Sequence, residues 1–246
     1  MAKIKQSPNK SSGSTEQKLV PDISPELKAQ ITHIGETAVL EWHDKDPIHG
    51  CTYDLIHDEK RLAAAAEMEL RVWQEQGFGD LDEYAQHIKH SRTFAAFNGK
   101  ECVGVGRLFA ASEAGLPPFV TSMPFYEQDV RTALNGECEQ GLAEEFGTVA
   151  VSESLRDGIV FTHIARLSYR DARARGVKTW GIIREPELVA KWNEHYGFTF
   201  KQVGESIDYQ GGMCAAHIMD LDEVDRNMSQ KFPEIYDWFV NQPLDA

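Results

Sequence analysis

From Ala143 to Phe200 the sequence has a regular order of hydrophobic patterns, and this stretch constrains the fold most. Residues 145–151 alternate with the period of two that a β-strand requires. A glycine-containing loop follows, and from residue 161 the apolar side chains have helical spacing. A short buried strand (177–185) and a second helix, beginning at Pro186, come next. Strands and helices that alternate in this way predict an α/β fold.

Two hairpins and two helices are predicted around this stretch. The turn pair Asn98-Gly99 joins two strand-like runs, and Gly211-Gly212 joins two more near the C-terminus. A helix is expected from 58 to 76, with an apolar stripe that includes Leu62 and Trp73, and a second one from 81 to 90. The proline-rich stretch 112–141, with a helix near 125–134, is expected to cover a pocket.

Composition divides the chain into four parts. Residues 1–20 are polar and are expected to form a disordered tail, and residues 21–50 form an N-terminal extension with a helix start at Ser24-Pro25. Residues 51–225 form the main domain, and 226–246 a helical C-terminal tail. With 246 residues, of which 41% are hydrophobic, one domain with extensions is expected.

The charge of the chain is uneven. A net charge of −14 argues against a general affinity for nucleic acid or anionic membranes. Between 156 and 191, however, eight Lys or Arg face four acidic residues, a net charge of +4. This basic stretch is either an ordinary solvated helix face or a docking surface for an acidic partner.

The cysteine and hydropathy patterns suggest a cytoplasmic protein. The four cysteines are far apart and form no C-x-x-C pair, which is typical of free thiols in a reducing compartment. No apolar run of about 18 residues could cross a bilayer, and we expect no integral membrane segment. Among the nine histidines, His87 and His90 would share a helix face, but without a partnering carboxylate or Cys cluster no metal is expected.

Two charged residues lie on strand faces that are otherwise apolar. Alternation places Arg107 with Val105 and Phe109. It is either a strand-end arginine with a buried stem, or a fixed cation for a carboxylate or carbonyl group. Glu145 shares a face with Val149 and Val151, so it either caps the strand in water or accepts a proton in a buried site.

The loop before the first helix of the stretch has the features of an anion site. Backbone N–H groups at a helix start attract anions, Gly158 permits close approach, and Arg156 adds a positive charge. Glycine and serine are also common in ordinary turns between strands and helices. The loop alone therefore leaves both interpretations open.

Three segments together resemble the GNAT acyltransferase superfamily over roughly residues 51–221. They are ELRVWQEQGFG (69–79), VGVGRLFA (103–110) and AEEFGTVAV (143–151), and they are most similar to the N-acyl amino acid synthase and acyl-homoserine lactone synthase branch. The resemblance implies an α/β (α+β) GNAT fold: a mixed central sheet with splayed middle strands, flanked by helices on both faces. It also implies transfer of a long-chain acyl group from acyl-carrier protein or acyl-CoA to an amino acid or small amine.

The resemblance also implies roles for individual residues. Glu145 would deprotonate the amine, with Arg107 near the substrate and Arg71 on the acceptor side. Trp73 and Trp180 are further candidates for substrate binding. The backbone at Val149 and Val151 would bind the pantetheine amides of the donor. The donor's phosphate would be held by Arg156, Asp157, Gly158 and Ile159.

The sequence departs from the family pattern at three places. Gly147 and Thr148 stand where the branch has Ser and Arg, so an ion pair beside Glu145 is missing. Val160 replaces the second glycine of the loop, which suits a single phosphate, as in an acyl-phosphopantetheine arm, better than a diphosphate. Asn193 stands at the position of a general-acid tyrosine.

Three functions remain open from the sequence. The first is the long-chain N-acyltransferase, with an acyl-carrier protein docked on the basic residues Arg166, Arg170 and Arg173. The second is an acetyl-CoA-dependent N-acetyltransferase. The third is a non-catalytic GNAT-like protein that binds a ligand.

Overall fold

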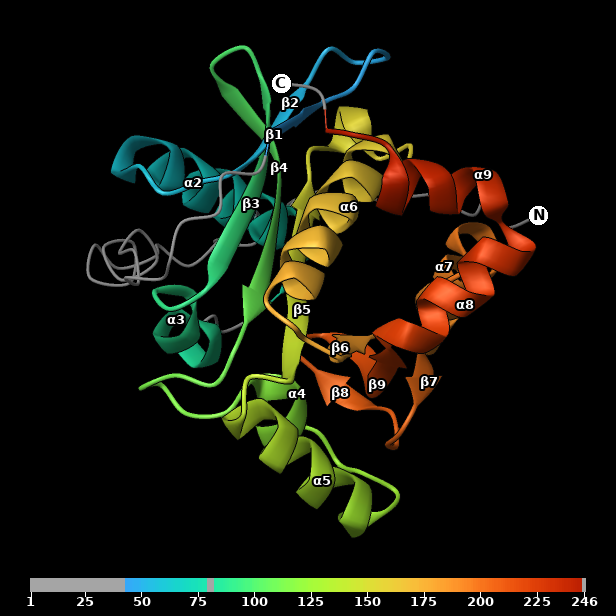
Figure 1. The fold of residues 1–246 in the computed structure, drawn as a ribbon. Helices are drawn as coiled ribbons and strands as arrows, with labels where there is room; N and C mark the ends of the chain where they lie inside the picture. The colour runs from blue at the N-terminus through green and yellow to red at the C-terminus, as the bar shows by residue number, and fades with distance from the viewer. Residues whose placement is uncertain (1–42, 79–81, 245–246) are drawn as a thin grey trace, which may run out of the picture.

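The computed structural model describes residues 43–78 and 82–244, which form one mixed sheet with helices on both faces (Figure 1). The tail 1–20 and the helix expected at Ser24 lie outside the described residues. The strands are β1 (His43–Lys45), β2 (Thr52–Leu55), β3 (Arg92–Asn98), β4 (Glu101–Phe109), β5 (Ala143–Val151), β6 (Thr179–Arg184), β7 (Lys201–Gln202), β8 (Ile207–Tyr209) and β9 (Gly212–Asp220). The helices are α2 (Glu59–Gln76), α3 (Asp82–Ile88), α4 (Pro118–Thr121), α5 (Gln128–Glu139), α6 (Ile159–Ala174), α7 (Pro186–Tyr196), α8 (Leu221–Lys231) and α9 (Pro233–Tyr236), with a 3₁₀ turn η1 (Glu153–Leu155) and a π-helical turn η2 (Asp237–Asn241).

The middle of the sheet is splayed. Along the sheet the strand order is β1-β2-β3-β4-β5-β6-β9-β7, and β8 also pairs with β9. The parallel pairing of β5 with β6 runs only from Ala143 opposite Thr179 to Glu145 opposite Gly181. Beyond that point β5 continues to Val151 without pairing to β6. The expected mixed sheet with splayed middle strands is therefore confirmed.

Helices cover both faces of the sheet, and α6 approaches β4 closely because this strand has glycines beneath the helix. A Cβ atom at Gly104 or Gly106 would come within 2.5 Å of a side chain of α6. On the opposite face, the predicted stripe of α2 is buried, Asp58 caps the helix at its N-terminus and Gly77 ends it with φ 71°. Figure 1 shows α2 and α3 on one side of the strands and α6 on the other.

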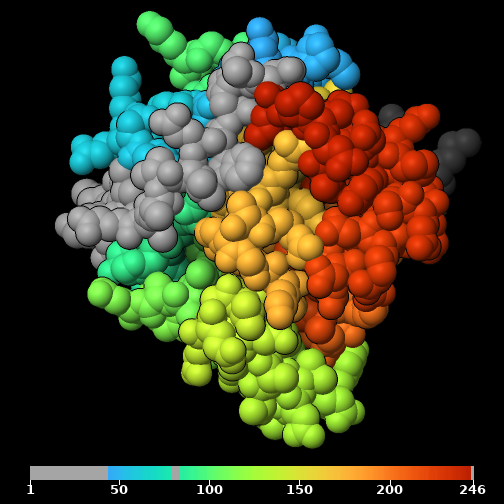
Figure 2. All heavy atoms as spheres, in the orientation of Figure 1, coloured from blue at the N-terminus to red at the C-terminus, as the bar shows by residue number. Residues whose placement is uncertain are grey.

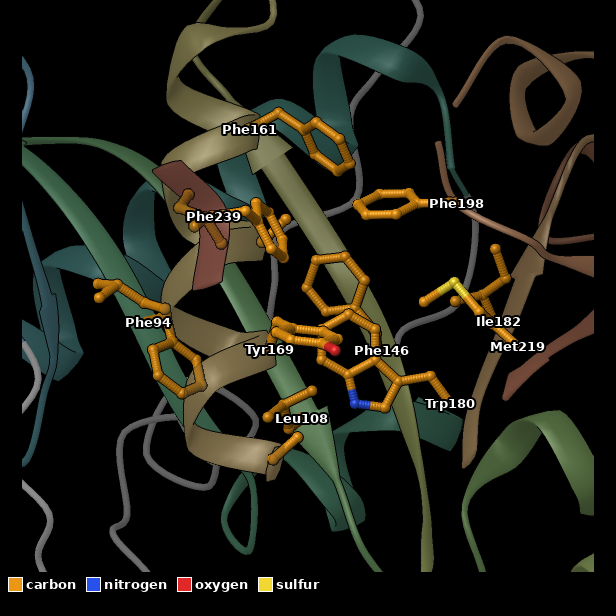
Figure 3. Packing of buried hydrophobic residues seen from close by; sticks show 14 of the residues in the cluster. Phe94, Leu108, Phe146, Phe161, Tyr169, Trp180, Ile182, Phe198, Met219 and Phe239 are labelled. Atoms are coloured by element: carbon orange, nitrogen blue, oxygen red, sulfur yellow. The ribbon is translucent and has the colours of Figure 1, made fainter. Parts of the chain in front are cut away.

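The core beneath α6 is aromatic. Trp180 of β6 stacks on Phe146 of β5, with ring centroids 4.8 Å apart, and meets the ring of Tyr169 of α6 edge-on at 5.9 Å. Figure 3 shows these three side chains gathered next to α6. This cluster fixes the paired ends of β5 and β6, so the strands can diverge only farther along.

The stretch 112–141 fills a core, contrary to the expectation that it covers a pocket. Phe119 of α4 is fully buried, and a Cβ atom at Gly181 would lie 2.2 Å from its ring. Without a side chain at position 181, the phenylalanine can lie flat against β6. The helix expected near 125–134 is α5, at 128–139.

Both predicted hairpins form, with adjustments. In the first, Asn98 pairs with Glu101, so the two turn residues are Gly99 and Lys100 and the predicted pair is wrong by one position. In the second, Tyr209 pairs with Gly212, so the two turn residues are Gln210 and Gly211, and the predicted pair Gly211-Gly212 is also wrong by one position. The run expected as one long strand before this turn is broken into β7 and β8, both of which pair with β9.

The C-terminal segment (221–244) lies beside α6, where Figure 2 shows it in red along this helix. Its residues bind the arginines that were expected to form a docking surface. Arg166 is buried and binds Asp44 of β1 and the carbonyl of Gln242. Arg170 donates to the same carbonyl and to that of Phe239.

The third arginine of the expected docking surface is also paired. Arg173 binds Asp222 at 2.7 Å and Asp225 at 3.2 Å, both on α8. The docking expectation is therefore wrong for this face, because the three guanidinium groups bind other parts of the same chain. Net charge along the sequence could not reveal this intramolecular pairing.

Candidate active site

A cavity of about 400 Å³ opens where β5 and β6 diverge. Its lining comes from both faces of the sheet: from α2 and α3 on one side, and from α6 and α7 on the other. The lining includes Trp73, Phe78, Tyr84, Thr148, Val149, Val151, Arg156, Gly158, Phe161, Arg184, Glu185, Leu188, Trp192, Tyr196, Tyr209, Gln210 and Cys214. Two reactants could therefore approach the gap from opposite faces of the sheet.

A β-bulge in β5 shapes the wall of this cavity. Val105 of β4 pairs with Ala150 and Arg107 pairs with Gly147, so β5 carries one extra residue between these pairs. The bulge includes Thr148, whose φ of 41° is unusual for a β-branched residue. Its buried hydroxyl has no hydrogen-bond partner among the described residues. A strained residue with an unsatisfied polar group is typical of a site that binds a ligand.

The bulge also reverses the alternation of side chains along β5. Val149 and Val151 pack in the cluster beneath α6, together with Phe146, whereas Ala150 packs beneath α2. Glu145 lies on the other side of the strand, near α3 and α4. The predicted shared face of Glu145, Val149 and Val151 is therefore wrong, because a strict period of two fails at a bulge.

The backbone of β5 has a free edge at the cavity. Ser152 donates its N–H to Val103 of β4, so the polar groups of Val151 point the other way, into the gap left by β6. Val149 has the same orientation by alternation. The carbonyl of Val151 accepts a hydrogen bond of 2.9 Å from Arg156 Nε.

Glu145 is fully buried and does not line the cavity. Its Oε2 accepts the N–H of Phe119 at 2.9 Å, and its Oε1 accepts the hydroxyl of Tyr84 at 3.2 Å. Tyr84 does line the cavity. Burial raises the pKa of Tyr84 well above its usual value, and the charge of Glu145 raises it further. Tyr84 therefore stays protonated and connects Glu145 to the cavity.

Arg107 is an internal partner of α2 and has no contact with the cavity. Its guanidinium binds Glu69 at 2.7 and 2.9 Å and donates to Thr93 at 2.6 Å. The side chain is 1% exposed. The interpretation as a strand-end arginine that reaches solvent is wrong, and the carboxylate that this fixed cation binds is that of Glu69.

The expected phosphate loop has mixed charge. Gly158 has φ 99°, and a Cβ atom there would lie 2.8 Å from the hydroxyl of Tyr196, so only glycine fits. Asp157 accepts the N–H of Ile159 at 3.0 Å, which occupies one of the N–H groups at the start of α6. This hydrogen bond lowers the pKa of Asp157, so its negative charge persists. Arg156 faces the cavity, with Glu75 at 3.6 Å.

The fold places the three remaining predicted residues in different environments: the cavity wall, the core and the surface. Trp73 lines the cavity, as expected for a residue on the buried stripe of α2. Trp180 is fully buried in the aromatic core and donates to Glu144, so it cannot contact a substrate. Arg71 is exposed and does not line the cavity. Its helical position already pointed away from the buried stripe.

Several cavity residues were missed in the sequence. Phe161, Trp192 and Tyr196 form an aromatic group, in which Phe161 stacks on Trp192 at 4.6 Å. Arg184 and Gln210 come from the end of β6 and from the β8–β9 turn. The start of α7 at Pro186 marks the end of β6, which is where sheet folds place ligands. No comparable signal singles out Gln210.

The described part of the chain contains neither a cluster of metal ligands nor a membrane-spanning helix. No group of three His, Cys, Asp or Glu residues there is arranged to hold a metal ion. No helix there is long and apolar enough to cross a membrane.

Comparison with known proteins supports the fold. No protein-family model and no curated protein matches the sequence. Among solved structures, the fold is similar to FeeM, an N-acyl amino acid synthase from uncultured soil microbes, with a TM-score of 0.59 and 15% identity over 72% of this chain and 94% of FeeM. Weaker matches include the AHL synthase LasI (TM-score 0.49, 13% identity, 74% of this chain and 93% of LasI) and an acyl-CoA N-acyltransferase from Pseudomonas aeruginosa (0.48, 13%, 66% and 92%). The likeness to FeeM confirms the GNAT-type fold expected from the sequence.

Proposed function

We propose that this protein is an N-acyltransferase, which moves an acyl group from a phosphopantetheine thioester to the amine of an amino acid or small amine. The observation that carries the proposal is the cavity at the splayed strands, because its lining residues come from both faces of the sheet. A thioester and an amine can meet there from opposite faces, which is the alignment that acyl transfer requires. The likeness in fold to FeeM supports the same activity.

The donor binds along the free edge of β5. The backbone N–H and C=O groups of Val149 and Val151 that point away from β4 are suited to hydrogen-bond the amides of a pantetheine arm. The arm would pair with β5 in the way that a neighbouring strand pairs. Arg156 and the N-terminus of α6 at Gly158 lie at the same end of the cavity and bind the donor's phosphate. The carboxylate of Asp157 in the same loop favours a single phosphate over a diphosphate.

The acyl chain occupies the apolar part of the cavity. Aromatic and aliphatic side chains line it from both faces, including Trp73, Phe78, Phe161, Leu188 and Trp192. About 400 Å³ exceeds what an acetyl group fills. A medium or long acyl chain therefore fits better than acetyl.

The reaction needs one proton acceptor. The neutral amine attacks the thioester carbon, the C–S bond breaks, and the leaving thiolate takes a proton from the medium, to which Glu145 later returns the proton that it accepts. Glu145 accepts the amine proton through Tyr84: the tyrosine hydroxyl receives it and passes its own proton to Glu145 at 3.2 Å. The N–H group of Val151, which points away from β4, is suited to stabilise the oxyanion.

The test is acyl transfer by the purified full-length chain. Decanoyl-CoA and decanoyl acyl-carrier protein are offered with a mixture of amino acids and amines, and products are detected by mass spectrometry. Glu145→Gln and Tyr84→Phe should each lower kcat by about 100-fold or more, which is the usual contribution of general base catalysis. Glu67→Gln, an exposed carboxylate of α2, is the matched control.

Donor binding distinguishes a lost catalyst from a lost fold. Both variants should bind decanoyl-CoA as tightly as the wild type in calorimetry. The absence of product from the wild type with every donor and acceptor would refute the proposed function. If Glu145→Gln turned over normally, the transferase would stand and Glu145 would have no part in the proton transfer.

A further inference from the structure

Arg184 is a cation in the cavity without a carboxylate partner. Among the described residues, no carboxylate oxygen lies within 4.0 Å of its guanidinium, and its one hydrogen bond, of 3.5 Å, goes to the carbonyl of Ile183 next to it. Other half-buried or buried arginines, such as Arg92, Arg107 and Arg175, bind carboxylates at 2.5–2.9 Å. A half-buried guanidinium that lacks such a partner is poised for an anionic ligand.

A second unsatisfied donor lines the same cavity. The Nε2 atom of Gln210 is buried and has no hydrogen-bond partner among the described residues. Its backbone has φ 53°, which a side chain other than glycine rarely adopts. The β8–β9 turn therefore holds a strained residue whose amide group remains available.

A negative charge stands beside these two donors. Glu185 follows Arg184 in the chain and also lines the cavity. A Cβ atom at Gly212 would lie 3.4 Å from Glu185 Oε1, which places this carboxylate at the base of the β8–β9 turn. Among the described residues its side chain has no ion pair within 4.0 Å.

Arg184 acts on the side of the cavity that faces α3. Burial raises the pKa of the Cys214 thiol to about 11, Glu185 raises it further, and Arg184 opposes the rise. Arg184 also opposes the rise in the pKa of Tyr84. Both affected groups line the cavity, and Tyr84 connects it to Glu145. The cation therefore lies within electrostatic range of the group to which we assign proton transfer.

We propose that Arg184 selects the acceptor: its guanidinium binds the carboxylate of a zwitterionic amino acid, with Gln210 as an additional donor. This inference rests on the proposed acyltransferase function and defines its acceptor. The carboxylate of Glu185 matches the ammonium group of such a molecule and repels a phosphate dianion. A phosphate of the donor is also an anion, but the start of α6 already provides a site for it at Gly158.

The experiment compares amino acids with their carboxamides as acceptors, using decanoyl-CoA as donor. Each of the twenty standard amino acids is paired with its amide, which keeps the amine and side chain but lacks the negative charge. The wild type should prefer the acid by roughly 10- to 100-fold in kcat/KM, the usual effect of a charged hydrogen bond. Arg184→Gln should raise the acceptor KM by a similar factor, with kcat little changed, and should abolish the preference.

Three controls assign the effect to the carboxylate. Arg184→Lys keeps the charge and should restore part of the preference, and Arg226→Gln, which removes an exposed arginine of α8 outside the cavity, should change nothing. The donor KM should stay constant in Arg184→Gln. Its thermal unfolding should match the wild type, and Gln210→Ala, which keeps Arg184, should weaken the preference independently.

The outcomes separate the two proposals. Equal use of acids and amides by the wild type, together with clear acyl transfer, would overturn the acceptor inference and leave the acyltransferase standing. A rise in the donor KM alone in Arg184→Gln would assign the arginine to the donor phosphate and overturn the inference as well. No transfer to any acceptor would overturn both.

Discussion

The buried pair of Arg107 and Glu69 allows structural and catalytic roles to be separated. Arg107→Met removes the guanidinium and leaves the Glu69 carboxylate, 2% exposed, without its cation. Breaking a buried ion pair from one side costs about 3–5 kcal/mol. For an m-value of about 3 kcal/mol/M in urea, the unfolding midpoint should fall by roughly 1–1.7 M. A loss of this size is a large share of the typical stability of a domain.

The double variant Glu69→Leu/Arg107→Met tests the reasoning. It removes both charges and replaces them with apolar groups, so much of the lost stability should return. Urea unfolding followed by circular dichroism gives the free energy of unfolding of all four proteins of the cycle. If Arg107→Met alone were as stable as the wild type, or if the double variant were the least stable, the ion pair would not be structural. In the folded double variant, kcat should stay within about threefold of the wild type, since neither residue lines the cavity.

Three further predictions concern packing, pH and thiol chemistry. Gly181→Ala should lower the free energy of unfolding by about 1–3 kcal/mol, because its methyl group would meet the ring of Phe119, and an unchanged melting temperature would contradict this close packing. Burial alone would raise the pKa of Asp44, but hydrogen bonds and positive charge from its partners on α6 hold this pKa below the ordinary value of 3.8. The ionised carboxylate therefore stabilises the fold above pH 3.8, and this contribution is lost as the pH falls through the lowered pKa. The stability difference between wild type and Asp44→Asn in urea should therefore shrink below about pH 4, and a constant difference down to pH 2 would refute it. Because the pKa of Cys214 is about 11, about one thiol in a thousand is ionised at pH 8, and iodoacetamide should modify it far more slowly than free cysteine, as peptide mass spectrometry would show.

Much of the fold was predicted from local patterns. The helix 58–76 was correct in extent because its cap at Asp58, its apolar stripe and the terminating Gly77 all act within a few residues. The order of strands and helices from 143 to 200 was correct for the same reason. Where a local rule was interrupted, prediction failed: the bulge at Thr148 inverted the strand faces that period-two alternation assigned.

The candidate site was predicted only in part. Val149, Val151, Arg156 and Gly158 line the cavity, as the sequence suggested for a donor site beside β5, and so does Trp73, a predicted substrate-binding residue. Most of the predicted charged residues do not line the cavity. A charged side chain binds whichever groups the tertiary fold brings near it. Their partners are separated from them by tens of residues or more, and no spacing rule connects such pairs.

The sequence by itself determined the extent of the helix at 58–76 and the order of strands and helices from 143 to 200. These properties depend on a residue and its near neighbours. Only the tertiary structure decided which charges are available. It neutralised Arg107 with Glu69 and Arg166 with Asp44, and it left Arg184 facing the cavity without a carboxylate partner among the described residues. The physical reason is that burial and ion pairing depend on distances in space, and segments far apart in the chain set those distances.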